Sequence, residues 1–293
     1  MTRPAELVLR SDALEVVLLP ELGGRLHRLR AFGTDLLRTP ANPALHADDP
    51  FSWGAYVMAP WCNRVQSGPM RIAGKTVDLA PNFADGSAIH GQVYARPWRE
   101  GADGSLHVVG GGGDDGWPWP YEVAASVSVD GPSLTLDYRL VNRSDTSMPA
   151  GIGLHPWFRR PVAVRLPAEL LYRANVRSEP EPEPVAGEHD LRVTREPVTN
   201  LDATWSGFTA PRVELAWPGD GIDAVIAVDA PHVLVAVATP AHTDAVAVEP
   251  QTHAPDGLRR LVNGEPDALT RVAPGETLRL TLRMTFDRAG GHP

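Results

Sequence analysis

Three short stretches of the sequence each place ionisable or hydrogen-bonding side chains close to aromatic residues and prolines. Their key residues are Asn63, Arg64 and His90 in the first stretch, His155 and Trp157 in the second, and Glu249 and Gln251 in the third. A carboxylate and an imidazole can act as general base and general acid in proton transfer. Guanidinium and amide groups donate hydrogen bonds to hydroxyls, and aromatic rings cover apolar surfaces. Together these residue types suit a ligand with many hydroxyls and apolar ring faces, such as a sugar.

The order and spacing of the motifs around these side chains resemble the aldose 1-epimerase family. The first stretch reads Pro-x-x-Asn-Arg-Val at 60–65, then a Gly-x-x-x-x-x-Gly-Lys hairpin at 68–75 and Ile-His-Gly at 89–91. The second reads Gly-x-Gly-x-His-Pro-aromatic-Phe at 151–158, and the third reads Val-Glu-Pro-x-Thr at 248–252. The resemblance runs in family order from Gly23-Gly24-Arg25 to Glu249 and is poor from Pro161 to Thr199.

The resemblance implies a fold and a reaction. The fold is a large antiparallel β-sandwich of the galactose mutarotase-like type, with a sugar cleft on one sheet. The reaction is the interconversion of the α and β anomers of a hexose by ring opening and reclosure. By the resemblance, Glu249 is the base that removes the proton of the anomeric hydroxyl, and His155 is the acid that protonates the ring oxygen. This chemistry requires no metal, nucleotide or redox cofactor.

The resemblance also implies a set of substrate-binding residues. Arg64 donates hydrogen bonds to sugar hydroxyls, supported by Asn63, while His90 contacts a ring substituent. Asp202, in a weaker match at 200–208, accepts hydrogen bonds from hydroxyls. Trp157 forms an aromatic wall at a position where the family usually has tyrosine, and Gln251 belongs to the same set.

Each of these residues has a plainer interpretation when it is taken alone. Arg64 then forms a surface ion pair, and His90 is a satisfied histidine at a strand end. Glu249 ends an apolar strand and is solvated there. Asp202 is the N-cap of a short helix over Ala203–Phe208.

Three other functions remain open on the sequence. An enzyme for a phosphorylated or sulfonated sugar needs a basic anion clamp, for which Arg71, Lys75 and Arg96 are available. A non-catalytic carbohydrate-binding protein has no need of a Glu249–His155 pair. A metal site at His90, His155 and His253 lacks the usual His-x-His or His-Glu-x-x-His spacing.

The elements that position these residues are mainly strands, because apolar residues alternate with polar ones from end to end. The alternation predicts strands at 14–19, 224–228, 232–238 and 277–286, and a hairpin of 121–129 with 134–140 around Asp130-Gly131. The 29 prolines and 27 glycines leave little room for helices, the best short candidate being Ala203–Phe208. Residues 110–116 and 179–184 read as loops. We expect a single domain over residues 1–293.

Several tryptophans lie close to the polar candidates, but most of them are expected in the core. The eight tryptophans include Trp53, Trp61, Trp98, Trp117, Trp119 and Trp157. Taken singly, such a residue is more often buried packing than a ligand platform.

Composition limits the environment and the partners. The formal net charge is -9 and is spread along the chain, which disfavours a nucleic acid partner. Cys62 is the only cysteine, so no intramolecular disulfide is possible. No apolar run is long enough to span a membrane, and the start resembles no signal peptide. We therefore expect a cytoplasmic protein. The resemblance implies a small-molecule sugar as its partner, and we expect a monomer or homodimer.

Overall fold

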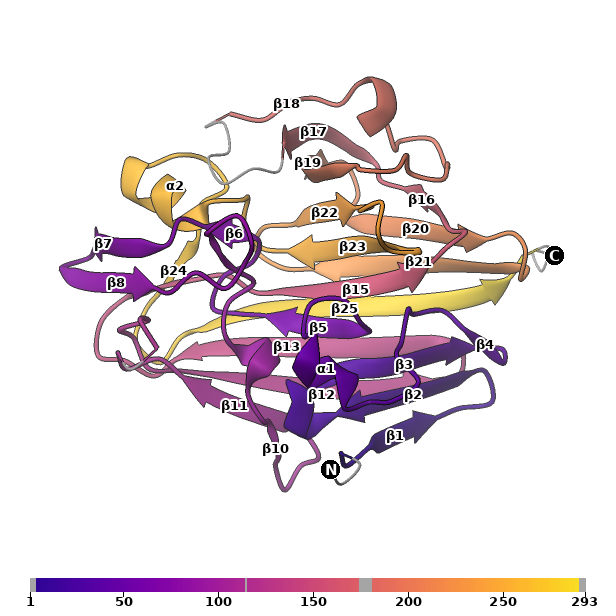
Figure 1. Ribbon diagram of the computed structural model, residues 1–293, viewed down its shortest axis with the longest axis horizontal. Helices are drawn as coiled ribbons and strands as arrows, with labels where there is room; N and C mark the ends of the chain where they lie inside the picture. The colour runs from indigo at the N-terminus through magenta and orange to yellow at the C-terminus, as the bar shows by residue number, and fades with distance from the viewer. Residues whose placement is uncertain (1–3, 114, 174–180, 290–293) are drawn as a thin grey trace.

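Alternating apolar residues form two stacked antiparallel sheets, which a computed structural model describes for residues 4–113, 115–173 and 181–289. The first sheet has eleven strands in the order β1-β2-β3-β5-β15-β23-β22-β19-β17-β18, with β4 paired to β3 (Figure 1). Their bounds are β1 Leu7–Arg10, β2 Leu14–Leu19, β3 Arg25–Ala31, β4 Thr34–Asp35, β5 Ala55–Met58, β15 Gly153–Arg159, β17 Ala168–Arg173, β18 Glu183–Pro184, β19 Asp202–Phe208, β22 Leu234–Ala238 and β23 Ala245–Gln251.

The second sheet has eight strands in the order β10-β11-β12-β13-β25-β21-β20-β16. Their bounds are β10 Arg99–Glu100, β11 Leu106–Gly110, β12 Tyr121–Asp130, β13 Ser133–Asn142, β16 Ala163–Arg165, β20 Arg212–Trp217, β21 Ile222–Asp229 and β25 Thr277–Arg288. Three small ladders pair β6 (Arg64–Val65) with β9 (Ala88–Ile89), β7 (Gly68–Ile72) with β8 (Lys75–Leu79), and β14 (Met148–Ala150) with β24 (Thr270–Val272).

Helix is confined to short segments in the described part of the chain. The α-helices are α1 (Leu45–Asp48) and α2 (Gly257–Asn263), and single 3-10 turns occur at η1 (Pro20–Leu22), η2 (Val93–Ala95) and η3 (Gly187–His189). None of these helices has the length and apolar character that crossing a bilayer would require.

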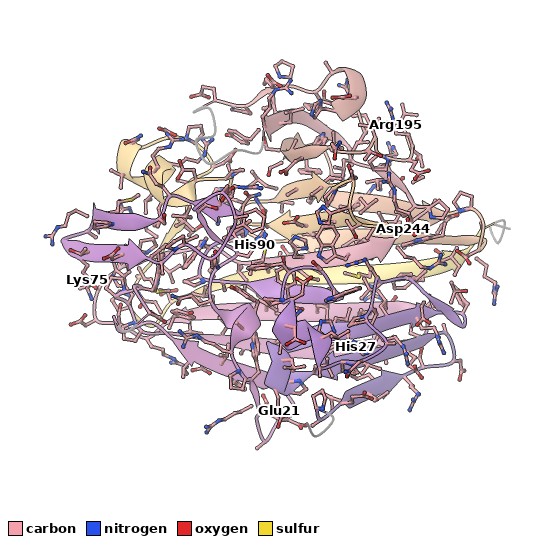
Figure 2. All side chains as sticks on the ribbon, viewed as in Figure 1. Glu21, His27, Lys75, His90, Arg195 and Asp244 are labelled. Carbon is pink, nitrogen blue, oxygen red and sulfur yellow. The ribbon has the colours of Figure 1, made fainter. Side chains whose placement is uncertain are left out.

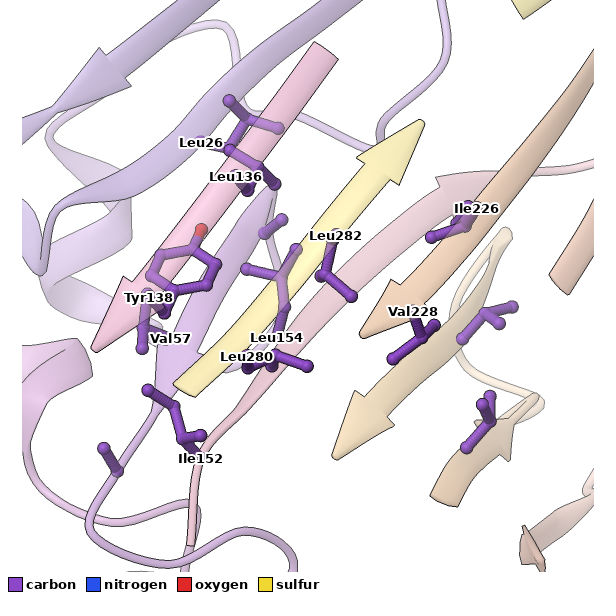
Figure 3. Packing of buried hydrophobic residues seen from close by; sticks show 14 of the residues in the cluster. Leu26, Val57, Leu136, Tyr138, Ile152, Leu154, Ile226, Val228, Leu280 and Leu282 are labelled. Carbon is purple, nitrogen blue, oxygen red and sulfur yellow. The ribbon is translucent and has the colours of Figure 1, made fainter. Parts of the chain in front are cut away.

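The hydrophobic core lies between the two sheets. Figure 3 shows Val57 and Leu154 from the first sheet packed with Leu136, Leu280 and Leu282 from the second, and all of them are buried. Because side chains alternate along a strand, the residues that lie between these positions face away from the second sheet. The opposite face of the first sheet is therefore free to carry a site.

The predicted antiparallel sandwich is confirmed, and so are several of its parts. The strand at 14–19 is β2, the predicted hairpin is β12–β13, and the Gly-to-Lys hairpin at 68–75 is β7–β8. Of the predicted loop at 110–116, Gly110 ends β11, the other described residues connect the antiparallel strands β11 and β12, and residue 114 lies outside the described residues. In the predicted loop at 179–184, residues 179 and 180 lie outside the described residues and Glu183–Pro184 form β18.

The predicted helix at Ala203–Phe208 is wrong. This segment belongs to β19 and pairs with β17 on one side and β22 on the other. Trp205 and Ala203 point into the core, whereas Asp202 points to the other face. Pairing on both edges and burial of Trp205 override the weak local preference for a helical turn, so Asp202 caps no helix.

Candidate active site

A cavity of about 340 Å³ opens on the face of the first sheet that points away from the core. That volume lies in the range of ligand pockets. Its lining includes seven of the eight residues that the sequence indicated, namely Asn63, Arg64, His90, His155, Trp157, Asp202 and Glu249. Gln251 lies outside the lining; it is fully buried and donates its amide hydrogen bond to the His253 carbonyl.

The register of two central strands brings Glu249 and His155 together. β15 pairs with β23 at Gly153–Gln251 and at Trp157–Ala247, which sets His155 opposite Glu249. Nε2 of His155 lies 3.1 Å from Oε1 of Glu249, and about 95% of each side chain is buried (5% and 4% exposed). The sequence therefore identified the two members of this pair, and the sheet supplies the contact.

Both residues are followed by a proline inside a central strand. Pro156 and Pro250 have no N–H, so neither can donate a hydrogen bond to the ladder between β15 and β23. Proline is unusual in a central strand, and here the two prolines flank the buried pair. The sequence suggested that Glu249 ends its strand, and this is wrong. β23 continues through Pro250, which pairs with Val235.

A second row of the same sheet forms the floor of the cavity. Asp202 pairs with Ala238, Ala238 with Ala247, and Ala247 with Trp157. Ala238 lines the cavity between the Asp202 carboxylate on one flank and the Trp157 ring on the other, and its small side chain leaves room for a ligand. This combination offers hydrogen bonds and an apolar surface to one ligand.

Asn63 and His90 lock each other in place through their backbones. Both have positive φ values (53° and 61°), which are uncommon for residues other than glycine. The His90 N–H donates to the Asn63 carbonyl at 3.1 Å, and the Asn63 N–H donates to Nδ1 of His90 at 3.2 Å. Since Nδ1 accepts, the proton of the neutral imidazole is on Nε2. His90 is thus a hydrogen-bond donor toward the cavity.

Arg64 reaches the cavity between two carboxylates. Its Nε donates to Asp85 at 2.9 Å, and its Nη1 lies 3.5 Å from Asp202. Asp85 in turn accepts hydrogen bonds from the N–H and hydroxyl of Ser87. The Arg64 side chain is 17% exposed, and these contacts fix the orientation of its guanidinium. Its plain interpretation as a surface ion pair therefore describes only part of its environment.

The electrostatics of the buried pair favour the neutral form of each residue. Burial, followed by the nearby charge of Asp202, raises the pKa of Glu249 to about 8. Burial lowers the pKa of His155 to about 3, and Arg25 adds to that effect. Burial also lowers the pKa of His90, and partial burial raises the pKa of Asp202. Such shifts in a cleft are typical of functional sites.

The donors of His90, His155 and Glu249 lie within 4.8 Å of one another, a spacing that could also suit a metal ion. The hydrogen bonds of His90 argue against that use. A ligating histidine offers one nitrogen lone pair to the metal and donates its other N–H, whereas Nδ1 of His90 already accepts a hydrogen bond. His253 lies apart from the cavity, with Nε2 accepting from the Cys62 N–H and Nδ1 against the Ala254 carbonyl.

Further residues of the cavity carried no motif signal in the sequence, among them Phe51, Ser52, Tyr56, Phe83 and His242. They come from loops that fold over the sheet and from β5, whose residues are all buried. Of the six tryptophans named in the sequence analysis, Trp61, Trp98, Trp117 and Trp119 are core residues, Trp157 lines the cavity, and Trp53 is half-buried beneath the Arg38 guanidinium.

The family model for aldose 1-epimerase matches residues 6–285, which is nearly the whole chain. The chain belongs to the aldose 1-epimerase family. It is 26% identical over 249 residues to the uncharacterized Escherichia coli K12 protein YphB, covering 79% of this chain and 83% of YphB.

Solved structures show that the fold is shared as well. A galactose mutarotase-like protein from Clostridium acetobutylicum has a TM-score of 0.82 at 17% identity, covering 96% of this chain and 94% of that one. Galactose 1-epimerase from Lactobacillus acidophilus NCFM has a TM-score of 0.78 at 17% identity, covering 97% and 94%. At 17% identity, these similarities show that the chain shares the fold of the two proteins, and they do not identify its substrate.

Proposed function

We propose that this aldose 1-epimerase family member is a mutarotase, an isomerase that interconverts the α and β anomers of an unphosphorylated hexose. The observation that carries the proposal is the buried contact of 3.1 Å between His155 and Glu249 in a cavity lined by hydrogen-bonding groups and an aromatic wall. Neutral polar donors and apolar ring surfaces are what a sugar requires.

The proposed reaction is a proton exchange at the two oxygens bonded to C1. Glu249 accepts the proton of the anomeric hydroxyl, the C1–O5 bond breaks as the carbonyl forms at C1, and His155 gives a proton to O5. Rotation about C1–C2 presents the other face of the carbonyl. On reclosure O5 attacks C1, His155 takes back the O5 proton and Glu249 returns a proton to the carbonyl oxygen. Each turnover restores the starting protonation.

The raised pKa of Glu249 and the lowered pKa of His155 fit this scheme if the pair holds one shared proton. A proton on Glu249 next to neutral His155 is the same overall charge state as a carboxylate next to an imidazolium. Transfer across the 3.1 Å contact therefore produces the base and the acid together. The pair then needs no proton from solvent at the moment of reaction.

A phosphorylated or sulfonated sugar is disfavoured by where the basic residues lie. Arg71 donates a hydrogen bond to the Thr76 hydroxyl, and Arg96 forms an ion pair with Asp115. Nζ of Lys75 lies 5.7 Å from the centroid of the Trp119 ring. None of these three lines the cavity. Figure 2 shows Lys75 at the end of the β7–β8 hairpin, away from His90. Arg64 already serves Asp85 and Asp202, so little positive charge is left for an anion.

A non-catalytic sugar-binding protein is also disfavoured, since binding alone gives no reason to keep an ionisable pair buried against its desolvation cost.

The experiment that tests the proposed mutarotase activity follows freshly dissolved α-glucose and α-galactose by polarimetry in a weakly catalytic buffer, with and without protein. We expect accelerated equilibration that is unchanged by excess chelator. Unchanged equilibration across hexoses and pentoses, or acceleration of glucose 6-phosphate alone, would contradict the proposal.

Arg64→Ala tests the binding part of the proposal. Loss of a charged donor to a hydroxyl typically costs about 1.5–3 kcal/mol, so catalytic efficiency should fall by about 10-fold or more. Arg71→Ala on the exposed hairpin is the matched control and should behave like the parent on hexoses. An Arg64→Ala efficiency within about twofold of the parent would remove Arg64 from the binding site.

The remaining expectations belong to the same proposal and rest on the sequence. They are a cytoplasmic location, a monomer or homodimer, a small-molecule sugar as the partner in place of nucleic acid or membrane, and a reaction without a cofactor.

A further inference from the structure

Tyr56 occupies a position that the proposed reaction does not explain. It lies in β5, pairs with His155 of β15, and lines the cavity. Its side chain is fully buried, yet its hydroxyl has no hydrogen-bond partner among the residues that the structure describes. A buried hydroxyl without a partner costs free energy, so the ring is the part of the residue that contributes at this position.

The ring of Tyr56 stacks on the imidazole of His155. The ring centroids are 4.6 Å apart and the planes differ by 20°. Trp157 and His90 contact the same imidazole at 4.9 Å each, the latter edge-on at 87°. With Glu249 on the next strand, these rings leave His155 one orientation, in which Nε2 meets the carboxylate.

Arg25 lies on the other side of Tyr56. Leu26 of β3 pairs with Ala55 of β5, which places Arg25 beside Tyr56, and the guanidinium carbon is 5.5 Å from the Tyr56 ring centroid. Arg25 is 1% exposed and donates to the carbonyls of Pro50 and Tyr94 and to Nδ1 of His46. In the described ranges it forms no ion pair with a carboxylate, and the nearby charge of Asp49 offsets only part of the lowering of its pKa by burial.

One row of side chains therefore crosses four neighbouring strands, in the order Arg25, Tyr56, His155 and Glu249. We infer that Tyr56 is a positioning residue for the proposed reaction: its ring holds the imidazole of His155 against Glu249 and separates it from the charge of Arg25. The inference rests on the proposed function for its kinetic consequence. Its structural part can be tested without a substrate.

The charged and titratable groups around His155 support a role for Arg25 in its protonation. His90 and Tyr56 face the imidazole as neutral groups, and Glu249 faces it with a raised pKa. Burial is the larger cause of the lowered pKa of His155, and the positive charge of Arg25 lowers it further. An unpaired buried cation behind the ring disfavours imidazolium, so the shared proton stays on the Glu249 side until a sugar binds.

The kinetic test compares Tyr56→Leu with Tyr56→Phe. Phenylalanine keeps the stacked ring and loses only the unpartnered hydroxyl, so we expect kcat within about 3-fold of the parent and an equal or higher thermal midpoint. Leucine removes the ring, and we expect kcat to fall at least about 10-fold because the imidazole is no longer held in line. KM should stay within about 2-fold in both, because the Tyr56 side chain borders the cavity but is fully buried behind its other lining residues. Parental kcat in Tyr56→Leu, or equal losses in both variants, would overturn the inference.

The second test is an NMR titration of the His155 imidazole, assigned by its absence from the spectrum of His155→Asn. In Arg25→Met the titration midpoint should move to higher pH by at least about 0.5, because a nearby positive charge is removed. Arg25→Lys keeps the charge and should stay close to the parent. Equal midpoints in the two variants would overturn the role of Arg25. If Arg25→Met does not fold, the comparison of the Tyr56 variants decides.

The two tests separate this inference from the proposed function. A parent protein that accelerates no sugar would defeat the mutarotase proposal, while the titration would still report whether Arg25 and Tyr56 control His155.

Discussion

At the scale of single residues, one physical cause acts in opposite directions on the two central groups. Burial disfavours charge, so it raises the pKa of the Glu249 carboxyl and lowers the pKa of the His155 imidazole. In the proposed reaction the pair holds one proton between Oε1 and Nε2. An acid and a base would then be available from a pair that is neutral before the sugar binds.

Glu249→Gln keeps nearly the same shape and removes the ability to accept a proton. We expect kcat to fall by about 10²-fold or more with little change in sugar affinity. His155→Asn should behave similarly, and the double variant should lose far less than the product of the two losses, because both groups serve one ring-opening event. Glu276→Gln, in an exposed turn, is the control. A folded Glu249→Gln protein with the parental rate would refute the mechanism.

The shared proton predicts the pH dependence of turnover. Above a pH of about 8 the pair loses its proton, and below about 3 it gains a second one, so kcat should be bell-shaped between these values. Polarimetry across pH in the range where the protein is folded measures it. A rate that rises through pH 8 would instead mean that Glu249 acts as an isolated carboxylate.

Most residues of the candidate site could be predicted from the sequence because each stands in a motif with fixed spacing. Tyr56 could not, because its stretch reads as a short apolar strand and its importance depends on the pairing of β5 with β15. Phe51 and Ser52 could not be predicted from the sequence for a related reason. Their loop reaches the cavity through tertiary contacts, such as the hydrogen bond from the Trp157 indole to the Phe51 carbonyl, and these leave no local pattern.

At the scale of elements, the strands that carry the site differ from the outer strands in pattern. β21 alternates buried and exposed residues throughout, whereas β5 and β23 are buried on both faces. Alternation made β21 and β25 predictable from sequence. The segment at 203–208 was wrongly predicted as a helix. It belongs to the seven-residue strand β19, which is stabilised by pairing with β17 and β22, and this pairing leaves no signal in the local sequence.

Gly91 illustrates how closely these elements approach each other at the site. Its φ is +71°, and a Cβ added there would lie 2.0 Å from the carbonyl oxygen of Ala59. Gly74 has a similar φ of +80° but nothing within 4 Å of an added Cβ. Gly74→Ala is therefore expected to cost about 1–2 kcal/mol of unfolding free energy for its backbone conformation alone.

Gly91→Ala should cost at least about 3 kcal/mol, because the backbone of Ala59 must move as well. It should also raise KM for the sugar, since the neighbouring His90 moves with it, whereas Gly74→Ala should leave KM unchanged. Urea denaturation and polarimetry measure the two effects. Equal losses of stability in the two variants would show that the contact with Ala59 is not tight.

At the scale of the whole molecule, the sandwich separates stability from chemistry. The core between the two sheets contains the large apolar side chains, and the opposite face of the first sheet carries the polar cavity. The site still affects folding, because Glu249 must remain buried whether or not it is charged. A buried carboxyl that resists ionisation destabilises the folded chain wherever the unfolded chain ionises freely.

This coupling gives the stability of the protein a pH dependence that one substitution should remove. In the unfolded chain Glu249 ionises near the ordinary glutamate pKa of 4.5, and in the folded chain its pKa is about 8. Below pH 4.5 both states hold the proton, between pH 4.5 and 8 only the folded state does, and above 8 neither does. The contribution of Glu249 to the unfolding free energy is therefore largest below pH 4.5, and it declines as the pH rises to about 8.

Glu249→Gln has no such titration, so its unfolding free energy should exceed that of the parent by a margin that grows between pH 4.5 and 8 and then levels off. The total growth should be on the order of 5 kcal/mol, because the pKa differs by about 3.5 between the two states and each unit contributes about 1.4 kcal/mol. Urea denaturation of both proteins at about pH 5, 6.5, 8 and 9 measures this margin, and groups that titrate equally in both cancel in the difference. Glu276→Gln, at an exposed position, should show no such growth. A constant margin across this range would mean that Glu249 is already ionised in the folded protein at neutral pH, and the shared-proton description of the site would fail with it.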